Sequence, residues 1–143
     1  MNDFLKLDKQ LCFAIYETAG KFNKLYTSIL QPFGLTYPQY LVLLALWEKD
    51  HVTMKALGEK INLGTGTLTP MIARMEANGW VQKQRSTEDE RKVFISLQQK
   101  GLDEKENITQ KVSDAIQTCN IKQEEYECLM QKLSTLQAKL TKL

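Results

Sequence analysis

The chain has 143 residues, of which 43% are hydrophobic and 25% charged, and its formal net charge is +2. That length allows one domain whose core needs no metal or disulfide, and so small a net charge does not by itself indicate a polyanionic partner. Because no apolar run is long enough to cross a bilayer and MNDFLKLDKQ lacks the features of an export signal, we expect a cytoplasmic protein with reduced or redox-active cysteines.

The first predicted helix covers about residues 5–31, where apolar side chains recur every three or four positions. Pro32 and Gly34 end it. A second helix is predicted from Thr36, which is a favourable N-cap residue, with Pro38 tolerated in the first turn. Its continuation YLVLLALWEK is apolar on nearly every side, so we expect this helix to be the buried central one.

Two short helices are predicted next, joined by a turn that contains glycine. Thr53 can cap MKALGEKI, and TLTPMIARMEA ends at Asn78-Gly79. We expect Gly64 and Gly66 to let the turn between them close tightly. The string LGTGTLTP lacks the third glycine, the preceding strand and the Gly-Lys-Ser/Thr of nucleotide-binding loops. The pattern is instead typical of a helix-turn-helix.

The second of these helices is the candidate recognition helix. Acidic side chains are absent from Lys60 through Met75, so the segment is uncharged or basic. Hydroxyls and backbone N–H groups at its start suit contacts with phosphates and base edges in the major groove, although ordinary helix capping would use the same residues. The predicted DNA contacts here are Thr65, Gly66, Thr67, Thr69 and Arg74.

A β-hairpin is predicted directly after the helix-turn-helix, which is the winged arrangement. WVQKQR and KVFISL favour strands, and Ser86–Arg91 forms the loop between them. An arginine at the tip can enter a narrow minor groove, and Asp89 could hold Arg91 there by a charge-assisted hydrogen bond. The three acids of STEDER would be repelled by phosphate unless they are paired, and the alternative is a solvated turn. The candidate wing contacts are Arg85, Asp89, Arg91 and Lys92.

The C-terminal part returns to helical sequence from Gln98 to about Thr118, with a break at Cys119-Asn120 before a last helix. The last helix has an apolar stripe at alternating spacings of three and four, made of Tyr126, Leu129, Leu133, Leu136, Leu140 and Leu143. This stripe either packs on the chain's own first helix or pairs with a second chain. In the second case the predicted dimer interface contains Leu5, Leu11, Tyr126, Leu129, Leu133, Leu136 and Leu140.

Cys12, within QLCFAIY, is either a small buried hydrophobe or a reactive thiol. Tyr16 shares its helix face, whereas Tyr26 lies about 21 Å further along the axis of a straight helix. In an antiparallel dimer Tyr26 of one chain could lie beside Cys12 of the other, with Tyr37 nearby, and phenol O–H groups donating to sulfur would favour the thiolate. His51 is the only histidine, so we expect no metal site and no cofactor.

QLCFAIY, LTYPQYLVLLALWE, GTLTPMIARME and RSTEDERKVFISL, in this order and spacing, resemble the MarR family of winged-helix repressors. Within it they resemble the organic-hydroperoxide-sensing branch of OhrR-, MgrA- and SarZ-like regulators. The resemblance implies a mainly α fold with a small β-hairpin wing. It also implies an interlocked homodimer joined by residues of about 5–35 and 98–143, and a winged helix-turn-helix core of about 36–97 within one domain spanning 1–143.

The resemblance also implies a mechanism and a set of roles for individual residues. Cys12 would be the peroxide-reactive cysteine, supported by Tyr26 and Tyr37 of the partner subunit with Tyr16 nearby. The two-cysteine mode of that branch implies a disulfide between Cys12 and Cys119 of the other subunit, and Cys128, within the last helix, fits this role less well. Oxidation would release a pseudo-palindromic operator in double-stranded DNA.

Two alternative functions are consistent with the sequence. One is a regulator of the same family that is gated by a phenolic or lipid ligand, with Cys12 used only in packing. The other is a thiol peroxidase, in which Cys12 would turn over repeatedly. A basic wing and a threonine-rich helix have no purpose in a peroxidase.

Overall fold

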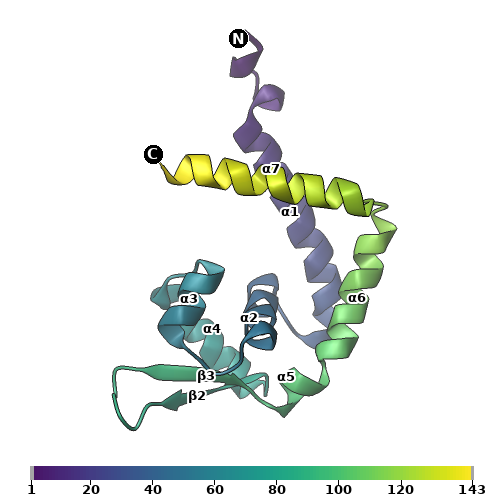
Figure 1. The fold of residues 1–143 in the computed structure, drawn as a ribbon. Helices are drawn as coiled ribbons and strands as arrows, with labels where there is room; N and C mark the ends of the chain where they lie inside the picture. Colours follow the sequence, from purple (N-terminus) through teal and green to yellow (C-terminus); the bar gives the residue numbers. More distant parts are fainter. Residues whose placement is uncertain (1, 143) are drawn as a thin grey trace. The chain divides into compact units, whose positions relative to one another are not determined.

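The computed structural model describes residues 2–142, so Leu143, the last residue of the predicted apolar stripe, lies outside the described residues. The chain divides into two compact units, one up to Thr109 and one from Gln110 onward. The division lies within helix α6 (Lys105–Thr118). Figure 1 shows the course of the chain through both units.

The first long helix, α1 (Leu11–Leu30), begins later than the predicted residue 5. Two 3-10 segments, η1 (Asn2–Leu5) and η2 (Leu7–Lys9), precede it. Lys6 and Gln10 have extended backbone angles, and a continuous helix cannot pass through extended residues. At its other end α1 runs into the 3-10 turn η3 (Gln31–Phe33), and Gly34 ends the turn in the left-handed conformation at φ 71°.

Helix α2 (Tyr37–Glu48) begins with the predicted cap. The Thr36 hydroxyl accepts the backbone N–H of Gln39 at 3.4 Å, and the Gln39 side chain accepts that of Thr36 at 3.0 Å. This capping box satisfies N–H groups that a helix start leaves without partners. The helix is central to the core, as predicted, and its most buried apolar residues are Tyr40, Val42, Leu43 and Leu46.

Among residues 2–142, none of the helices combines the length and the hydropathy of a membrane span. Leu11–Phe33 and Tyr37–Glu48 reach that length and hydropathy only when they are taken together, and a 75° bend separates them.

Helices α3 (Met54–Ile61) and α4 (Thr65–Ala77) form the helix-turn-helix. Thr53 caps α3 by accepting the N–H of Ala56 at 3.1 Å. The prediction that Gly64 and Gly66 close the turn was wrong, because a Cβ on either would meet no atom within 4 Å. Gly58 is the glycine that the turn requires, since a Cβ there would lie 2.8 Å from the Leu63 carbonyl oxygen.

The sheet has three antiparallel strands rather than the predicted two, in the order β1-β3-β2. Strands β2 (Val81–Arg85) and β3 (Val93–Leu97) form the predicted hairpin, with Val81 opposite Leu97 and Arg85 opposite Val93. The additional strand β1 (Val52–Thr53) pairs with β3. A helix-turn-helix followed by this hairpin is the winged-helix arrangement.

After the wing, α5 (Gln99–Asp103) lies against the core. The indole N–H of Trp47 donates to the Gly101 carbonyl at 2.9 Å, which links α2 to α5. Gly101 has no space for a side chain, because a Cβ would lie 2.6 Å from the Trp80 carbonyl oxygen. The core of this unit is formed by residues that include Leu30, Leu46, Leu57, Leu68, Ile72, Trp80, Ile95 and Ile108, each at most 1% exposed.

The second unit contains the end of α6 and the helix α7 (Gln123–Thr141). A turn at Cys119 and Asn120 separates the two helices, as predicted, and Asn120 is in the left-handed region at φ 56°. Asparagine adopts this conformation more readily than most residues.

Candidate nucleic-acid interface and thiol site

Helix α4 presents a polar start and a buried apolar side. Its N-cap Gly64 makes no side-chain capping bond, and its first turn contains no acidic residue. The buried residues Leu68, Met71, Ile72 and Met75 follow the helical period, and this fixes which side faces outward. The five predicted contacts are all exposed, namely Thr65, Gly66, Thr67, Thr69 and Arg74. Free backbone N–H groups and hydroxyls at such a helix start can donate to phosphate oxygens.

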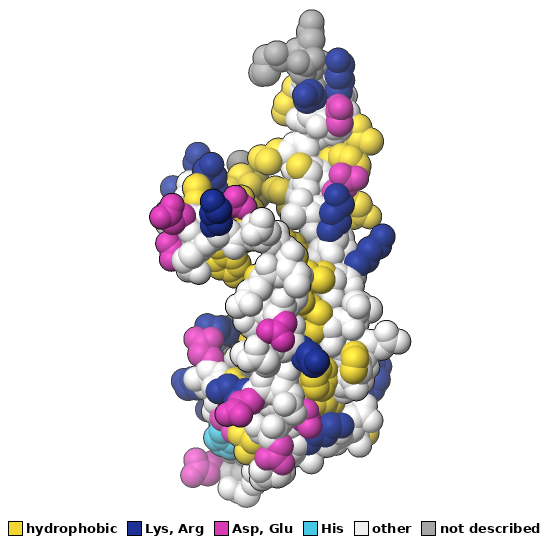
Figure 2. Space-filling view, turned by 90° about the vertical axis from the view of Figure 1, so that its right-hand side faces the viewer, with side chains coloured by type: hydrophobic (Ala, Val, Ile, Leu, Met, Phe, Trp, Pro, Cys, Tyr) yellow, Lys and Arg dark blue, Asp and Glu magenta, His cyan; other side chains and the backbone are white. Residues whose placement is uncertain are grey.

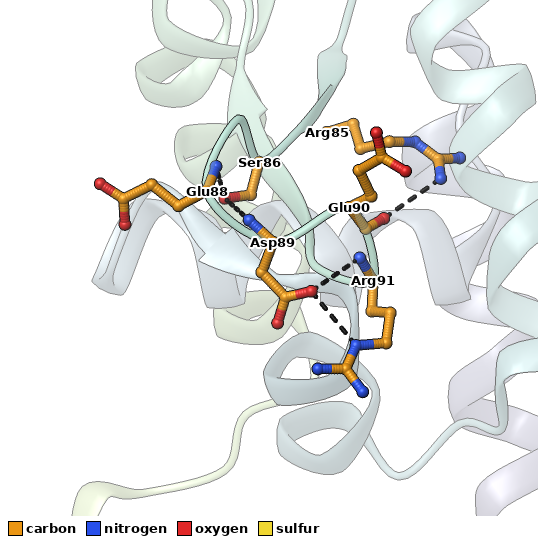
Figure 3. A network of polar contacts seen from close by, with 6 residues as sticks. All are labelled: Arg85, Ser86, Glu88, Asp89, Glu90 and Arg91. Atoms are coloured by element: carbon orange, nitrogen blue, oxygen red, sulfur yellow. Dashed lines mark hydrogen bonds and ion pairs between the residues drawn. The ribbon is translucent and has the colours of Figure 1, made fainter.

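The wing loop between β2 and β3 is closed by its own hydrogen bonds, and Figure 3 shows those that join Ser86 to Glu88 and Asp89. The Ser86 hydroxyl accepts the backbone N–H groups of Glu88 and Asp89, both at 3.2 Å. The Ser86 N–H in turn donates to the Lys92 carbonyl, and the Lys92 N–H donates to the Asp89 carbonyl, each at 2.9 Å. Lys92 thus closes the loop through its backbone while its side chain remains exposed.

The predicted contact between Asp89 and Arg91 is confirmed. One oxygen, Asp89 Oδ1, accepts the Arg91 backbone N–H at 3.0 Å and the Arg91 Nε–H at 3.2 Å. The Arg91 side chain is 92% exposed, so its guanidinium is oriented by the carboxylate and still available to a ligand. Arg85, at the end of β2, donates to the Glu90 carbonyl at 3.1 Å.

The three thiols are all exposed and none is in a disulfide. Cys12 is the second residue of α1, and its Sγ lies 3.8 Å from the Gln10 side-chain oxygen. Cys119 is in the turn after α6, with its Sγ 3.5 Å from the Ala115 carbonyl. Cys128 lies within α7. The expectation of a buried, inert Cys12 is not met within the single chain.

The structure brings two of the three predicted tyrosines together. The ring centroids of Tyr26 and Tyr37 are 5.0 Å apart. Tyr40, which sequence reasoning missed, completes the group with centroids 5.6 Å from Tyr26 and 6.5 Å from Tyr37. Its i,i+3 spacing from Tyr37 on one helix face was the available signal. Tyr16 is 75% exposed and lies near the other end of α1.

Within one chain, Cys12 cannot contact this tyrosine cluster of Tyr26, Tyr37 and Tyr40. Cys12 and Tyr26 are both in the continuous helix α1, fourteen residues apart in the sequence. At the rise of an α-helix this separation is about 21 Å along the axis. Any contact between the thiol and the phenols therefore requires a second chain.

Large apolar side chains are exposed along α1 and α7. Figure 2 shows apolar side chains gathered along the column that α1 forms. The exposed fractions are 86% for Leu5, at the end of η1 before α1, and 60% for Leu11, the first residue of α1. On α7 they are 48% for Tyr126, 49% for Leu129, 42% for Leu133 and 56% for Leu140. Leu136, the remaining predicted interface residue, is half-buried. So many exposed large apolar residues indicate an interaction surface.

Within the described part of the chain, no group of three or more His, Cys, Asp or Glu side chains could hold a metal ion. An open hollow of ≈ 540 Å³ lies at the corner between α1 and α2. Its lining is polar on the α1 side and includes Asn23, Thr27, Gln31, Thr36, Tyr37 and Pro38.

A sequence family described as transcriptional regulator SarA/Rot matches residues 24–108. The organic hydroperoxide resistance transcriptional regulator of Bacillus subtilis (strain 168) is 48% identical over 99 residues, which are 69% of this chain and 67% of that protein. The family match runs from within α1 through α2, the helix-turn-helix and the wing to the first turn of α6.

Two solved structures of AbfR, a protein of Staphylococcus epidermidis, are similar over nearly the whole chain. Overoxidised AbfR bound to DNA is 34% identical with a TM-score of 0.80, covering 97% of this chain and 98% of that one. The disulfide form of AbfR is 36% identical with a TM-score of 0.70, covering 94% and 95%. Both likenesses support the mainly α winged-helix fold predicted from the sequence.

Proposed function

Because this chain belongs to the SarA/Rot family of MarR-like winged-helix transcriptional regulators, we propose that it is a DNA-binding regulator that releases its operator when an organic hydroperoxide oxidises Cys12. One observation carries the sensing part of the proposal. An exposed thiol is in the first turn of α1, about 21 Å from a tyrosine cluster that it can contact only in a second chain.

The DNA-binding part of the proposal rests on α4 and the wing. The exposed start of α4 enters the major groove, where Thr65, Thr67 and Thr69 contact base edges and phosphates. Arg91 enters the adjacent minor groove in the orientation that Asp89 imposes. The pairing of Asp89 with Arg91 also removes part of the repulsion that the acidic wing would otherwise exert on phosphate.

A homodimer supplies the second chain. The exposed apolar residues of α1 and α7 are covered in it, and burying them stabilises the dimer. In an antiparallel arrangement of two α1 helices, Cys12 of one chain lies beside Tyr26 and Tyr37 of the other. Two recognition helices related by the dimer axis read a pseudo-palindromic operator with half-sites about one helical turn apart.

The oxidation step uses the thiolate of Cys12 as the nucleophile. The sulfur attacks the terminal oxygen of the hydroperoxide, the O–O bond breaks, and the alkoxide leaves and takes a proton to become an alcohol. Cys12 is then a sulfenic acid. In the dimer, the phenol O–H groups of the partner's tyrosine cluster donate hydrogen bonds to the sulfur that reacts.

A disulfide with Cys119 of the partner subunit completes the reaction. The Cys119 thiol attacks the sulfenic sulfur, an S–S bond forms and water leaves. Cys119 suits this role because it is exposed in the turn between α6 and α7, where the backbone is not held by a helix. The new bond alters the dimer interface, changes the spacing of the two recognition helices and lowers the affinity for the operator.

The test is DNA binding of the wild type and of Cys12→Ser, each with and without cumene hydroperoxide. The probe is a duplex that the reduced wild type enriches from a random-sequence pool. We expect peroxide to abolish binding by the wild type and to leave Cys12→Ser bound. Nonreducing electrophoresis shows a crosslinked dimer that disappears in Cys119→Ser and persists in the matched control Cys128→Ser. Release of DNA from Cys12→Ser by peroxide would contradict the proposal.

A second candidate function is supported by the hollow between α1 and α2. The hollow is open to solvent, and its lining combines amide and hydroxyl groups with the Tyr37 ring. In this alternative a phenolic or lipid ligand gates DNA binding. Cys12→Ser would then keep its full response to the ligand, whereas enlarging Thr27 into the hollow would reduce it.

A further inference from the structure

Glu76, in the last turn of α4, connects the candidate recognition helix to the wing. Its Oε2 accepts a hydrogen bond from the backbone N–H of Lys83 at 2.7 Å. Lys83 is the middle residue of β2, the strand that leads into the wing loop. The bond is short and its acceptor is charged, which places it among the stronger hydrogen bonds.

The register of the sheet explains why the Lys83 N–H is available. Leu97 in β3 donates its N–H to Asp50 at 2.9 Å, on the β1 side of the strand, and N–H groups two residues apart in a strand point the same way. The N–H of Ile95 therefore also points away from β2. Lys83 is opposite Ile95, so the N–H of Lys83 points to the outer edge of the sheet. Glu76 satisfies this edge N–H.

A second bridge at the same edge strengthens the connection. The side-chain amide of Gln98 donates to the backbone carbonyl of Glu76 at 3.4 Å and also to the carbonyl of Val81. Val81 lies two residues before Lys83 in the same strand, so its carbonyl also points to the outer edge of β2. The last turn of α4 and the outer edge of β2 are thus joined at two points.

Helix stability does not account for a glutamate at this position. The C-terminal end of a helix has a partial negative charge, so a carboxylate in the last turn is electrostatically unfavourable. Glu76 is the penultimate residue of α4. Its bond across to β2 offsets this cost, which indicates that the connection between helix and strand is what the residue provides.

We infer that Glu76 is a positioning residue, which fixes the wing relative to the recognition helix so that α4 and Arg91 can contact one duplex at the same time. This inference rests on the proposed DNA-binding function, in which Arg91 contacts the minor groove. Glu76 itself lies at the far end of α4 from the exposed threonines and acts through the backbone of β2.

The experiment combines amide hydrogen exchange at Lys83 with a double-mutant cycle. Glu76→Ala removes the acceptor, Glu76→Gln keeps an oxygen that can accept the same bond, and Glu48→Ala is a matched surface control at the end of α2. Affinity is measured on a duplex that the reduced wild type enriches from a random-sequence pool, in the presence and absence of the substitution Arg91→Ala.

We expect Glu76→Ala to accelerate Lys83 exchange and to weaken DNA binding by about tenfold, as loss of a hydrogen bond to a charged group implies. Glu76→Gln should recover most of the affinity, and Glu48→Ala should change neither quantity. With Arg91→Ala present, Glu76→Ala should weaken binding by less than about twofold, because the minor-groove contact that the wing position serves is already absent.

Two results would overturn the inference, and they differ from failure of the proposed function. The first is an unchanged rate of Lys83 amide exchange in Glu76→Ala, which is measured without DNA. The second is an equal loss of DNA affinity on Glu76→Ala whether residue 91 is arginine or alanine. If Arg91→Ala alone left the affinity unchanged, the wing contact of the proposed function would be wrong instead.

A second pair of variants approaches the same bond from the strand. Lys83→Pro removes the donor N–H at an edge position where no ladder bond is lost, and Lys83→Ala keeps the donor while removing the same charged side chain. Lys83→Pro should bind DNA more weakly than Lys83→Ala does, by about the factor expected for Glu76→Ala. This comparison remains available even if Glu76→Ala fails to fold. Equal affinities of the two Lys83 variants would contradict the inference.

Discussion

Asp89 holds Arg91 through a single carboxylate oxygen, which accepts both the backbone N–H and the Nε–H of the arginine. Asp89→Ala should therefore weaken DNA binding, although it removes a negative charge from a surface that meets phosphate. We expect a loss of about 1–2 kcal/mol in binding free energy, since the hydrogen bond involves charged groups. Gel shift or anisotropy titration measures it. The control Glu88→Ala should leave binding equal or slightly tighter, and tighter binding by Asp89→Ala would contradict the orienting role.

Arg74 is an exposed cation on α4, seven residues and about two helical turns after Thr67. If it contacts a phosphate, Arg74→Ala should weaken binding to all duplexes alike and reduce the slope of log affinity against log salt by about 1. Titrations at several salt concentrations give this slope. Lys139→Ala, near the end of α7, is the control, and an unchanged slope in Arg74→Ala would exclude a phosphate contact.

The Tyr37 ring meets both Tyr26 and Tyr40. Tyr37→Phe keeps the ring contacts and removes the hydroxyl, so the fold should be unaffected. We expect oxidation of Cys12 by cumene hydroperoxide to slow by about tenfold, which is the effect of losing about 1.4 kcal/mol of stabilisation of the thiolate or the transition state. Stopped-flow measurement of sulfenic acid formation provides the rate. A rate equal to that of the wild type would remove Tyr37 from the proposed site.

Leu133 is 42% exposed in the middle of the apolar stripe on α7. Leu133→Lys places a charge where the proposed dimer buries apolar surface, and a charge buried without a partner is costly. We expect the dimer to dissociate, by analytical ultracentrifugation, and operator affinity to fall because two linked half-site contacts become one. Gln131→Lys, on the same helix, is the control. A Leu133→Lys protein that stays dimeric would place the interface elsewhere.

Neighbouring residues in α2 provide a test of the core. Leu43 is fully buried and Leu44 is 41% exposed. Leu43→Ala should reduce the free energy of unfolding by about 2–5 kcal/mol, because it removes buried methyl groups and leaves a cavity. Leu44→Ala should cost less than about 1 kcal/mol. Urea denaturation followed by circular dichroism compares them. Equal losses would show that the Leu44 side chain is covered in the native assembly.

Local signals predicted most of the fold. Thr36 and Pro38 specify a helix start through interactions that span four residues, and the contact between Asp89 and Arg91 spans two. The change from helical to strand period at Trp80 similarly located the wing. Such features depend on residues that are close to one another along the chain, so the sequence alone is enough to recognise them.

Features that depend on distant packing were missed. Strand β1 has two residues and exists because β3, more than forty residues later, pairs with it. Gly58, rather than Gly64 or Gly66, is the glycine that the turn needs, because the limiting contact is with the carbonyl of Leu63 after the chain has reversed. The bond between Glu76 and Lys83 depends on which edge of β2 faces α4. Helical period and residue type do not contain this information.

The position of Trp47, fixed by its hydrogen bond to Gly101, makes its fluorescence a probe of the neighbouring tyrosine rings. Trp47 donates to Gly101 and meets the Tyr40 ring edge-on at 6.4 Å, whereas the other tryptophan, Trp80, is buried with Lys100 over its ring. A Trp80→Phe protein would contain a single indole chromophore, in contact with the phenol that packs against Tyr26 and Tyr37. Its emission would then report rearrangement of those aromatic rings in real time, without any added dye.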